Sequence, residues 1–227
     1  MSCAAICCCT FAARAQGTFQ NLGFESATLL PIPGDAYGRV QFTPAFSGWT
    51  GSVGGVQQSA ALYNSFFLDS SGIGLIDNGG HSSPAVIEGT YTAFLQAGNA
   101  LGTFTPADTT LSQTGLVPSV AQSLLLRADL DASAGAFVVT LGGQPLSLVA
   151  LGAGTNYTLY GADIRAWAGQ TAELDFTLIA QRPHIDDYTV FLDSIQFSGT
   201  AIPEPGVLGL STLGALLLSW RLWHKRR

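Results

Sequence analysis

Short apolar stretches separated by turn-forming residues are the feature that most restricts the fold of this chain. Between positions 17 and 199 they recur among clusters of glycine, proline, asparagine and aspartate. No internal repeat of fixed period and no long helical pattern runs through this region. Strands of this spacing, joined by tight turns, are typical of two-sheet all-β folds. The sequence therefore predicts a β-sandwich of about eight or more strands.

The clearest predicted strand is 171–180, in which apolar side chains alternate with polar ones. Such alternation buries one face of a strand and leaves the other in solvent. Further strands are predicted at 91–97, 122–130, 136–141, 146–151, 157–163 and 188–197. In "LGGQPLS", Gly142 and Gly143 can adopt the positive φ of a hairpin turn. The segment "ADIRAWAGQ" at 162–170 predicts one helical turn before the next strand.

The predicted sandwich is strongly acidic. Residues 16–202 contain four arginines, no lysine and 14 aspartates and glutamates, so the net charge of this region is about −10. A surface of that charge repels the phosphates of nucleic acids, which excludes nucleic acid as a partner. It suits cations or neutral ligands better.

The N-terminus has the pattern of an export signal. All four cysteines fall within the first nine residues, in the apolar run "CAAICCCTFAA", where they act as small hydrophobes. Ala13 and Ala15 then form an A-x-A cleavage site, so residues 1–15 are predicted to be a signal peptide. Basic residues before the apolar run are missing, which leaves the true start residue open, and the alternative is an N-terminus with no export role. The predicted mature chain has no cysteine, as suits an exported protein that does not depend on disulfides.

The C-terminus has the pattern of a membrane segment. Residues 207–220 are uncharged, and as a helix they would span about 21 Å. Extending the helix to about 206–223, with Arg221 reaching the interface, brings it close to bilayer thickness. The final Lys225-Arg226-Arg227 favours the cytoplasmic side. A buried helix of the globular body is the alternative, but the basic residues disfavour it.

Pro203-Glu204-Pro205 directly precedes this helix, and its two prolines hold the backbone extended. The order "IPEPG", apolar helix, "HKRR" resembles the PEP-CTERM sorting signal of exported proteins in Gram-negative bacteria that make extracellular polysaccharide. Ile202 stands where that family usually has valine. The resemblance implies an exosortase-type processing enzyme as partner, with cleavage near the tripeptide. The predicted organisation is signal peptide 1–15, β-sandwich 16–200 and sorting signal 201–227.

The opening segment "FQNLGFE" (19–25) and the closing segment "VFLDSIQF" (190–197) resemble those of jelly-roll, carbohydrate-binding modules, in which the first and last strands meet. Extended geometry would place Asp193 on the same face as Phe191, Ile195 and Phe197, toward the interior. The resemblance implies a structural calcium held by Glu25 and Asp193. The alternative places Asp193 at a bulge or under backbone amide donors.

Aromatic side chains in turns are candidates for sugar binding, because sugar rings stack on flat apolar surfaces. Trp49 in "FSGWTG" and Trp167 in "RAWAG" both lie in turn-rich stretches, so they are the predicted ligand-binding residues. The alternative is that each tryptophan covers one end of the core.

Motifs of catalysis are missing from the sequence, which has no G-x-S-x-G, H-E-x-x-H or phosphate-binding glycine loop. Three groups of residues could be assembled into an active site, but each is interpreted as solvated loop or strand. These groups are His184 with Asp186 and Asp187, His81 with Ser82 and Ser83, and Glu88 with Glu173 and Asp175.

The sequence thus predicts an exported, non-catalytic protein of the cell surface or extracellular matrix. It is held briefly by its C-terminal helix, is then sorted, and binds carbohydrate or exopolysaccharide or has a structural role. The alternatives are a secreted polysaccharide hydrolase and a surface protein that keeps its membrane anchor.

Overall fold

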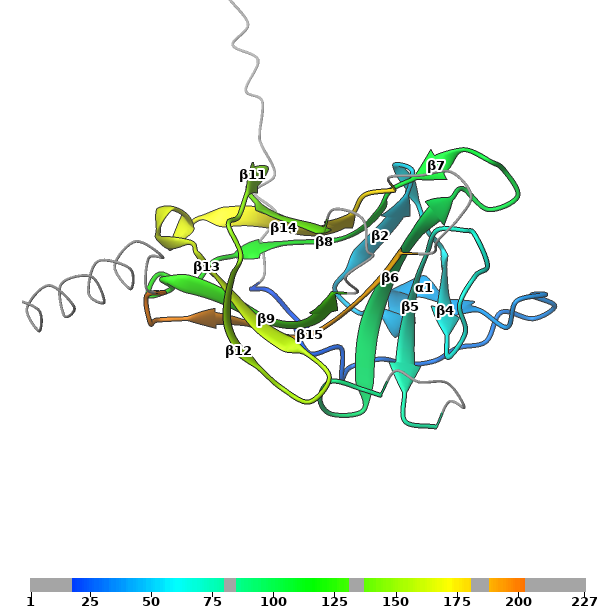
Figure 1. The fold of residues 1–227 in the computed structure, drawn as a ribbon, viewed down its shortest axis with the longest axis horizontal. Helices are drawn as coiled ribbons and strands as arrows, with labels where there is room; N and C mark the ends of the chain where they lie inside the picture. Colours follow the sequence, from blue (N-terminus) through cyan, green and yellow to red (C-terminus); the bar gives the residue numbers. More distant parts are fainter. Residues whose placement is uncertain (1–17, 80–84, 131–136, 181–187, 203–227) are drawn as a thin grey trace, which may run out of the picture.

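The computed structural model describes residues 18–79, 85–130, 137–180 and 188–202, and these residues form an all-β fold of two sheets in a sandwich-like arrangement (Figure 1). The larger sheet has the order β1 (Val40–Gln41), β4 (Ala60–Tyr63), β5 (Gly72–Asp77), β6 (Tyr91–Asn99), β15 (Tyr188–Ser198), β9 (Ser123–Leu130), β13 (Thr158–Asp163) and β12 (Val149–Ala153), and β7 (Pro106–Ala107) pairs with β6. The smaller sheet has the order β11 (Gln144–Pro145), β10 (Phe137–Leu141), β14 (Thr171–Leu178), β8 (Thr109–Leu116), β2 (Thr50–Val53) and β3 (Val56–Gln57). Two short helical elements, α1 (Phe42–Ala45) and η1 (Arg165–Trp167), complete the fold.

Alternation along the strands builds the core between the sheets. In β14 every second residue is buried, and Phe176 is aligned with Leu111 of β8 on one side and Val139 of β10 on the other. The larger sheet contributes Leu95 and Leu192, which are fully buried in the same cluster. The predicted half-buried strand at 171–180 is therefore confirmed, and the sandwich-like arrangement with it.

Most of the predicted strands are present with shifted ends. The hairpin turn is confirmed, with φ of 58° at Gly142 and 74° at Gly143, and the helical turn is η1. The strand expected at 146–151 is wrong in part, because β12 begins only at Val149. Before β12, the chain stays beside β10, because the Leu146 amide donates to the Val139 carbonyl and the Leu146 side chain packs on the core. The chain therefore joins the larger sheet only after this residue.

A second apolar cluster lies on the outer face of the larger sheet. Leu62, Ile76 and Phe94 form its buried centre, and Phe191 packs against it together with phenylalanines 66 and 67. The two phenylalanines belong to the connection 64–71, which joins the parallel strands β4 and β5. This connection covers the outer face of β5 and β6, so these two strands are buried on both sides.

The opening and closing segments meet, as their resemblance to jelly-roll modules implies. The Ile195 amide donates to the Leu22 carbonyl at 3.0 Å, and the rings of Phe19 and Phe197 lie 4.8 Å apart. The opening segment is a series of turns rather than a strand, with φ of 59° at Phe24. The end of the described chain packs on the larger sheet, where Ile202 occupies the space that a side chain at Gly161 would need.

The predicted signal peptide, Pro203-Glu204-Pro205 and the predicted membrane helix fall outside the described residues. Within the described ranges, no helix has the length and apolar character needed to cross a membrane.

Candidate functional site

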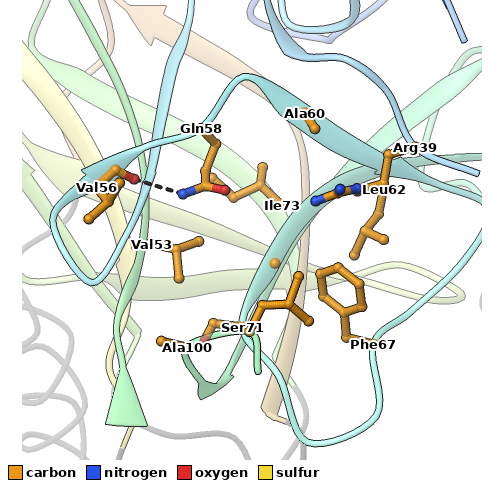
Figure 2. Close-up of a pocket in the computed structure, with 12 residues that line it drawn as sticks. Arg39, Val53, Val56, Gln58, Ala60, Leu62, Phe67, Ser71, Ile73 and Ala100 are labelled. Atoms are coloured by element: carbon orange, nitrogen blue, oxygen red, sulfur yellow. Dashed lines mark hydrogen bonds between the residues drawn. The ribbon is translucent and has the colours of Figure 1, made fainter. Parts of the chain in front are cut away.

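A pocket of about 180 Å³ opens beside β2, β3, β4 and β5, each of which contributes residues to its lining. Its walls come from four parts of the chain: residue 39 before β1, residues from 53 to 62, residues from 67 to 73, and residues 100 and 101 after β6. Gln58 and Arg39 lie on one side, and Phe67 and Ala100 lie on the other (Figure 2). The pocket therefore depends on the tertiary fold rather than on any local motif.

The floor of the pocket is apolar. Leu62, Phe67 and Ile73 form it, and Gly72 lies among them. A Cβ on Gly72 would come within 2.8 Å of Leu62 and 3.1 Å of Phe67, so the glycine makes room for both side chains. The close approach of the Gly72 backbone to the side chains of Leu62 and Phe67 thus shapes the floor.

A buried amide fixes the connection that supplies Phe67. Gln96 of β6 is 1% exposed, and its side chain accepts the Phe67 amide at 3.0 Å and donates to the Phe67 carbonyl at 2.6 Å. Ser71 is anchored as well, because its hydroxyl donates to the Ala107 carbonyl and accepts the Gly98 amide. Both hydrogen-bonding functions of the Ser71 hydroxyl are thus used within the protein.

Arg39 and Asp35 form the charged rim of the pocket. The Asp35 carboxylate accepts from the Arg39 amide and from its Nε and Nη2, which lowers the pKa of Asp35 to about 2. The guanidinium also lies 5.3 Å from the ring centre of Tyr37, which is 51% exposed and packs edge-on against Phe67 at 5.3 Å. Within the described chain, Nη1 of Arg39 has no protein acceptor.

Gln58 supplies the second polar group of the pocket. Its Nε2 donates to the Val56 carbonyl at 2.8 Å, which fixes the orientation of the amide (Figure 2). Among the described residues no donor reaches its Oε1. The pocket thus combines one unused donor group, one unused acceptor and an apolar floor.

Trp49 lies in the core, as in the alternative interpretation, so its burial gives no support to the prediction that it binds a ligand. It is 5% exposed, its ring packs against Phe24 and Phe176 at 5.6 and 6.0 Å, and its indole N–H donates to the Asn21 carbonyl at 3.0 Å. The indole is therefore part of the core, because its apolar face and its single donor both have partners inside the protein.

Trp167 lies elsewhere in the fold and keeps part of its surface exposed. It belongs to η1, packs against the edge of the core and covers the β10–β11 turn, where a Cβ on Gly142 would come within 2.8 Å of its Nε1. The structure does not bring the two predicted tryptophans together in one site. Trp167 stays a predicted ligand-binding residue apart from the pocket.

Asp193 is buried, at 1% exposed, but on a different face from the one predicted. Asp193 pairs with Arg127 and Gln196 with Leu125, so β15 has one extra residue between these pairs and Ser194 takes a φ of 49°. This bulge reverses the alternation, which sends Ile195 back to the core between the sheets. Asp193 therefore lies on the outer face and does not share a side with Ile195 or Phe197.

The carboxylate of Asp193 is surrounded by donors. Its Oδ2 accepts the Thr92 hydroxyl at 2.7 Å and the Glu88 amide at 3.2 Å, and its Oδ1 accepts the Ser194 amide at 2.6 Å. Burial raises the pKa of Asp193 to about 6, against the lowering effect of these donors. Asp193 thus ties the bulge of β15 to the segment that leads into β6.

Glu25 and Glu88 complete this carboxylate cluster. Glu25 accepts the amides of Thr90 and Tyr91, and Glu88 pairs with Arg127 and accepts the Ser194 hydroxyl. The Arg127 guanidinium holds the pKa of Glu88 below its usual value. The cluster joins the opening segment, the entry to β6, β9 and β15.

A calcium site in this cluster would need about six to eight oxygen ligands. Both oxygens of Glu25 and both oxygens of Asp193 already accept protein donors. No group of three or more His, Cys, Asp or Glu side chains in the described ranges could hold a metal ion. As arranged, the cluster is satisfied by protein donors, and calcium binding by Glu25 and Asp193 stays a prediction.

The acidic residues considered for hydrolysis do not form one group. Glu173 and Asp175 lie on the outer face of the smaller sheet, where Asp175 accepts the Thr140 hydroxyl at 2.7 Å. Glu88 lies on the outer face of the larger sheet, beside Arg127. The groups around His81 and His184 and the sorting tripeptide fall outside the described residues.

Sequence reasoning missed Arg39, Tyr37 and Gln58. The available signal was the loop "PIPGDAYGRV", in which an aromatic and an arginine occur among prolines and glycines. Gln58 had no signal of its own, because its role depends on segments that meet only in the folded chain.

Comparison with known proteins adds little to this picture. Neither a protein-family model nor a curated protein matches the chain. One solved structure, the enzymatically active domain of tailspike protein 4 from bacteriophage CBA120, aligns with a TM-score of 0.34 and 14% identity. The alignment covers 67% of this chain and 19% of the tailspike chain. A likeness of this strength carries no argument about activity.

Proposed function

We propose that this protein is an exported, non-catalytic protein of the cell surface or extracellular matrix whose sandwich binds polysaccharide through the pocket. One observation carries the binding proposal. The pocket places an unused donor, Arg39 Nη1, and an unused acceptor, Gln58 Oε1, over an apolar floor, with exposed Tyr37 at the rim. Sugars have apolar C–H faces and hydroxyls that both donate and accept, which suits this combination.

Charge favours a neutral sugar. Arg39 is already neutralised by Asp35, and the surrounding region is acidic, so an anionic sugar would gain no uncompensated cation. A neutral ring loses no charge solvation when it enters the pocket.

The route to the surface is proposed from the sequence. Residues 1–15 would direct export, the helix at about 206–223 would anchor the chain, and an exosortase-type enzyme would act near Pro203-Glu204-Pro205. The jelly-roll relationship and the calcium at Glu25 and Asp193 belong to the same proposal. Mass analysis of the mature protein should find a C-terminus near Pro205, and a chain that still ends at Arg227 would favour the permanent anchor.

The test of binding is retention of the full-length chain on the host's extracellular polysaccharide, with calcium and again with a chelator. Retention in both conditions supports binding without calcium, and retention lost with the chelator supports the calcium proposal. A folded protein that is retained in neither condition would refute carbohydrate binding.

Two matched variants locate the binding surface. Leu101 lines the pocket and is 42% exposed, whereas Leu116 lies at the end of β8 and is 40% exposed. Leu101→Asp should abolish retention and Leu116→Asp should preserve it. Equal retention by both variants would place binding outside the pocket.

A further inference from the structure

We propose that the pocket selects sugars that carry an acetamido group, such as N-acetylhexosamine units. This inference rests on the proposed carbohydrate binding and names the class of sugar. The polar groups that face the pocket are few, and most of its lining is aliphatic or aromatic. A ligand that fits must therefore place one donor, one acceptor and an apolar group within a small space.

The unused polar atoms define that ligand. Gln58 Oε1 can accept one N–H, and the hydrogen bond from its Nε2 to Val56 fixes which end of the amide is available. Arg39 Nη1 can donate to a carbonyl, because Nε and Nη2 are occupied by Asp35. An acetamido group has one N–H, one C=O and one methyl group. Its two polar atoms match these two protein groups in number and in kind.

The remaining lining fits the methyl group. Ile73 is 3% exposed and Leu62 2% exposed at the floor, and Val53 lines the adjoining wall. The Ser71 hydroxyl cannot serve an additional sugar hydroxyl well, because it already donates to Ala107 and accepts from Gly98. A hydroxyl in place of the acetamido group offers one polar atom where the acetamido group offers two, and it has no methyl group for the apolar floor, so a sugar that carries it would gain less free energy from the pocket.

Size is consistent with one substituted ring. A pocket of about 180 Å³ is too small for several residues of a polymer, so the rest of the chain would lie outside it. Tyr37 at the rim offers the face for the neighbouring ring, since it is half exposed and held by Arg39 and Phe67. The pocket thus selects one unit, and Tyr37 supports the next.

The experiment compares two neutral oligosaccharides that differ in this substituent. Chitotetraose carries an acetamido group at C2 of each ring, and cellotetraose carries a hydroxyl there. We expect the full-length chain to bind chitotetraose at least about tenfold more tightly by titration calorimetry, because a site built to hydrogen-bond a group rejects analogues that lack it. Deacetylated chitosan is not used, since its positive charge would attract the acidic protein regardless of the pocket.

Gln58→Ala supplies the variant and Gln57→Ala its control. Gln57 is exposed on β3 and does not line the pocket. Gln58→Ala should reduce the preference for chitotetraose roughly fivefold, as the loss of one hydrogen bond does, and Gln57→Ala should leave it unchanged. A preference that survives in Gln58→Ala would overturn the acetamido assignment.

The outcomes separate this inference from the proposed function. Equal affinity for the two oligosaccharides, weakened for both by Leu101→Asp, would refute acetamido selection and keep sugar binding in the pocket. No binding of either oligosaccharide, together with no retention on the host polysaccharide, would refute both.

Discussion

The pocket and the carboxylate cluster are both polar regions, but they use their polar atoms in opposite ways. At Asp193 each carboxylate oxygen accepts at least one protein donor, and the side chain is 1% exposed. At the pocket, Arg39 Nη1 and Gln58 Oε1 have no partner within the described ranges. Polar atoms that are satisfied internally hold segments together, and polar atoms left unsatisfied beside a cavity are available to a ligand.

This difference shows why an unusual acidic residue is not by itself a functional residue. Asp193 has the features that often mark a site, namely burial, a raised pKa and neighbouring carboxylates. Its hydrogen-bond partners, however, belong to the start of β6, the segment before it and the bulge of β15. Its role is therefore to stabilise the fold. The comparison predicts that changes at the cluster reduce stability, whereas changes at the pocket reduce binding.

The largest effect on stability is expected from Asp193→Ala. The amides of Glu88 and Ser194 and the hydroxyl of Thr92 would lose their acceptor. Unsatisfied buried donors cost about 1–3 kcal/mol each, and the removed desolvation of the carboxylate offsets part of that cost. We expect a loss of about 2–4 kcal/mol in the free energy of unfolding, measured with urea.

The control for that variant is Asp175→Ala on the outer face of the smaller sheet. Asp175 accepts one hydroxyl, that of Thr140, at the surface, so its loss should cost about 1 kcal/mol or less. Similar losses for the two variants would contradict the structural role assigned to Asp193.

The pH dependence of stability gives the next largest effect. The pKa of Asp193 is raised from 3.8 to about 6 on folding, so the folded state keeps its proton to higher pH than the unfolded state. Its contribution is fully present below pH 3.8 and is lost as pH rises through 6. The loss amounts to about 3 kcal/mol, at about 1.4 kcal/mol for each pH unit.

Other carboxylates have pKa values that are lowered on folding, and their contribution to stability rises with pH instead. The contribution of Asp193 is therefore measured as the difference between the wild type and a variant without this carboxylate. Unfolding free energies of the wild type and of Asp193→Asn, taken from pH 4 to pH 7, should be most alike at pH 4 and should separate progressively up to about pH 6. Calcium bound to the carboxylate would stabilise its charged form and reverse the sign. A wild type that gains stability relative to Asp193→Asn as pH rises would therefore support the calcium proposal.

Sequence patterns predicted the parts of the fold that depend on alternation. The strand at 171–180 and the paired glycines at 142 and 143 follow local rules, and both are present. Strands rich in small residues were missed, as in "GIGLID" of β5, because glycine has no side chain that can alternate. A bulge at Asp193 was the alternative in the sequence analysis, and the structure has one. Its effect on the faces of β15 was not predicted, because one extra residue reverses a face without changing the apolar pattern.

The candidate site was not predictable, because its residues are far apart in the sequence. Arg39, Gln58 and Phe67 lie on three separate connections, and Gln96 fixes one of them from a buried strand. The tryptophans show the same limit. Trp49 and Trp167 have similar turn-rich surroundings, yet Trp49 is buried against Phe24 and Trp167 is partly exposed.

A smaller effect is expected from Glu88→Gln, which removes the charge paired with Arg127. The Glu88 side chain is 54% exposed, so the pair contributes about 1 kcal/mol or less. Because the pKa of Glu88 is lowered on folding, this contribution is present at neutral pH and is lost as pH falls. Raising the salt concentration from about 0.1 to 1 M should remove most of the difference between the variant and the wild type. A difference that is independent of salt would assign the effect to the Ser194 hydrogen bond instead.

The smallest effect on stability is expected from Gln58→Ala, and this variant separates the two regions most sharply. Within the described ranges, the only protein hydrogen bond of the Gln58 side chain is to the Val56 carbonyl, at an exposed position. Substitutions of this kind change the free energy of unfolding by about 0.5 kcal/mol or less. The affinity of the variant for chitotetraose should nevertheless fall, because the variant lacks the Oε1 acceptor that is proposed to bind the acetamido N–H. A variant that unfolds more easily and binds as well as the wild type would reverse the assignment, and the pocket would then be another internally satisfied part of the fold.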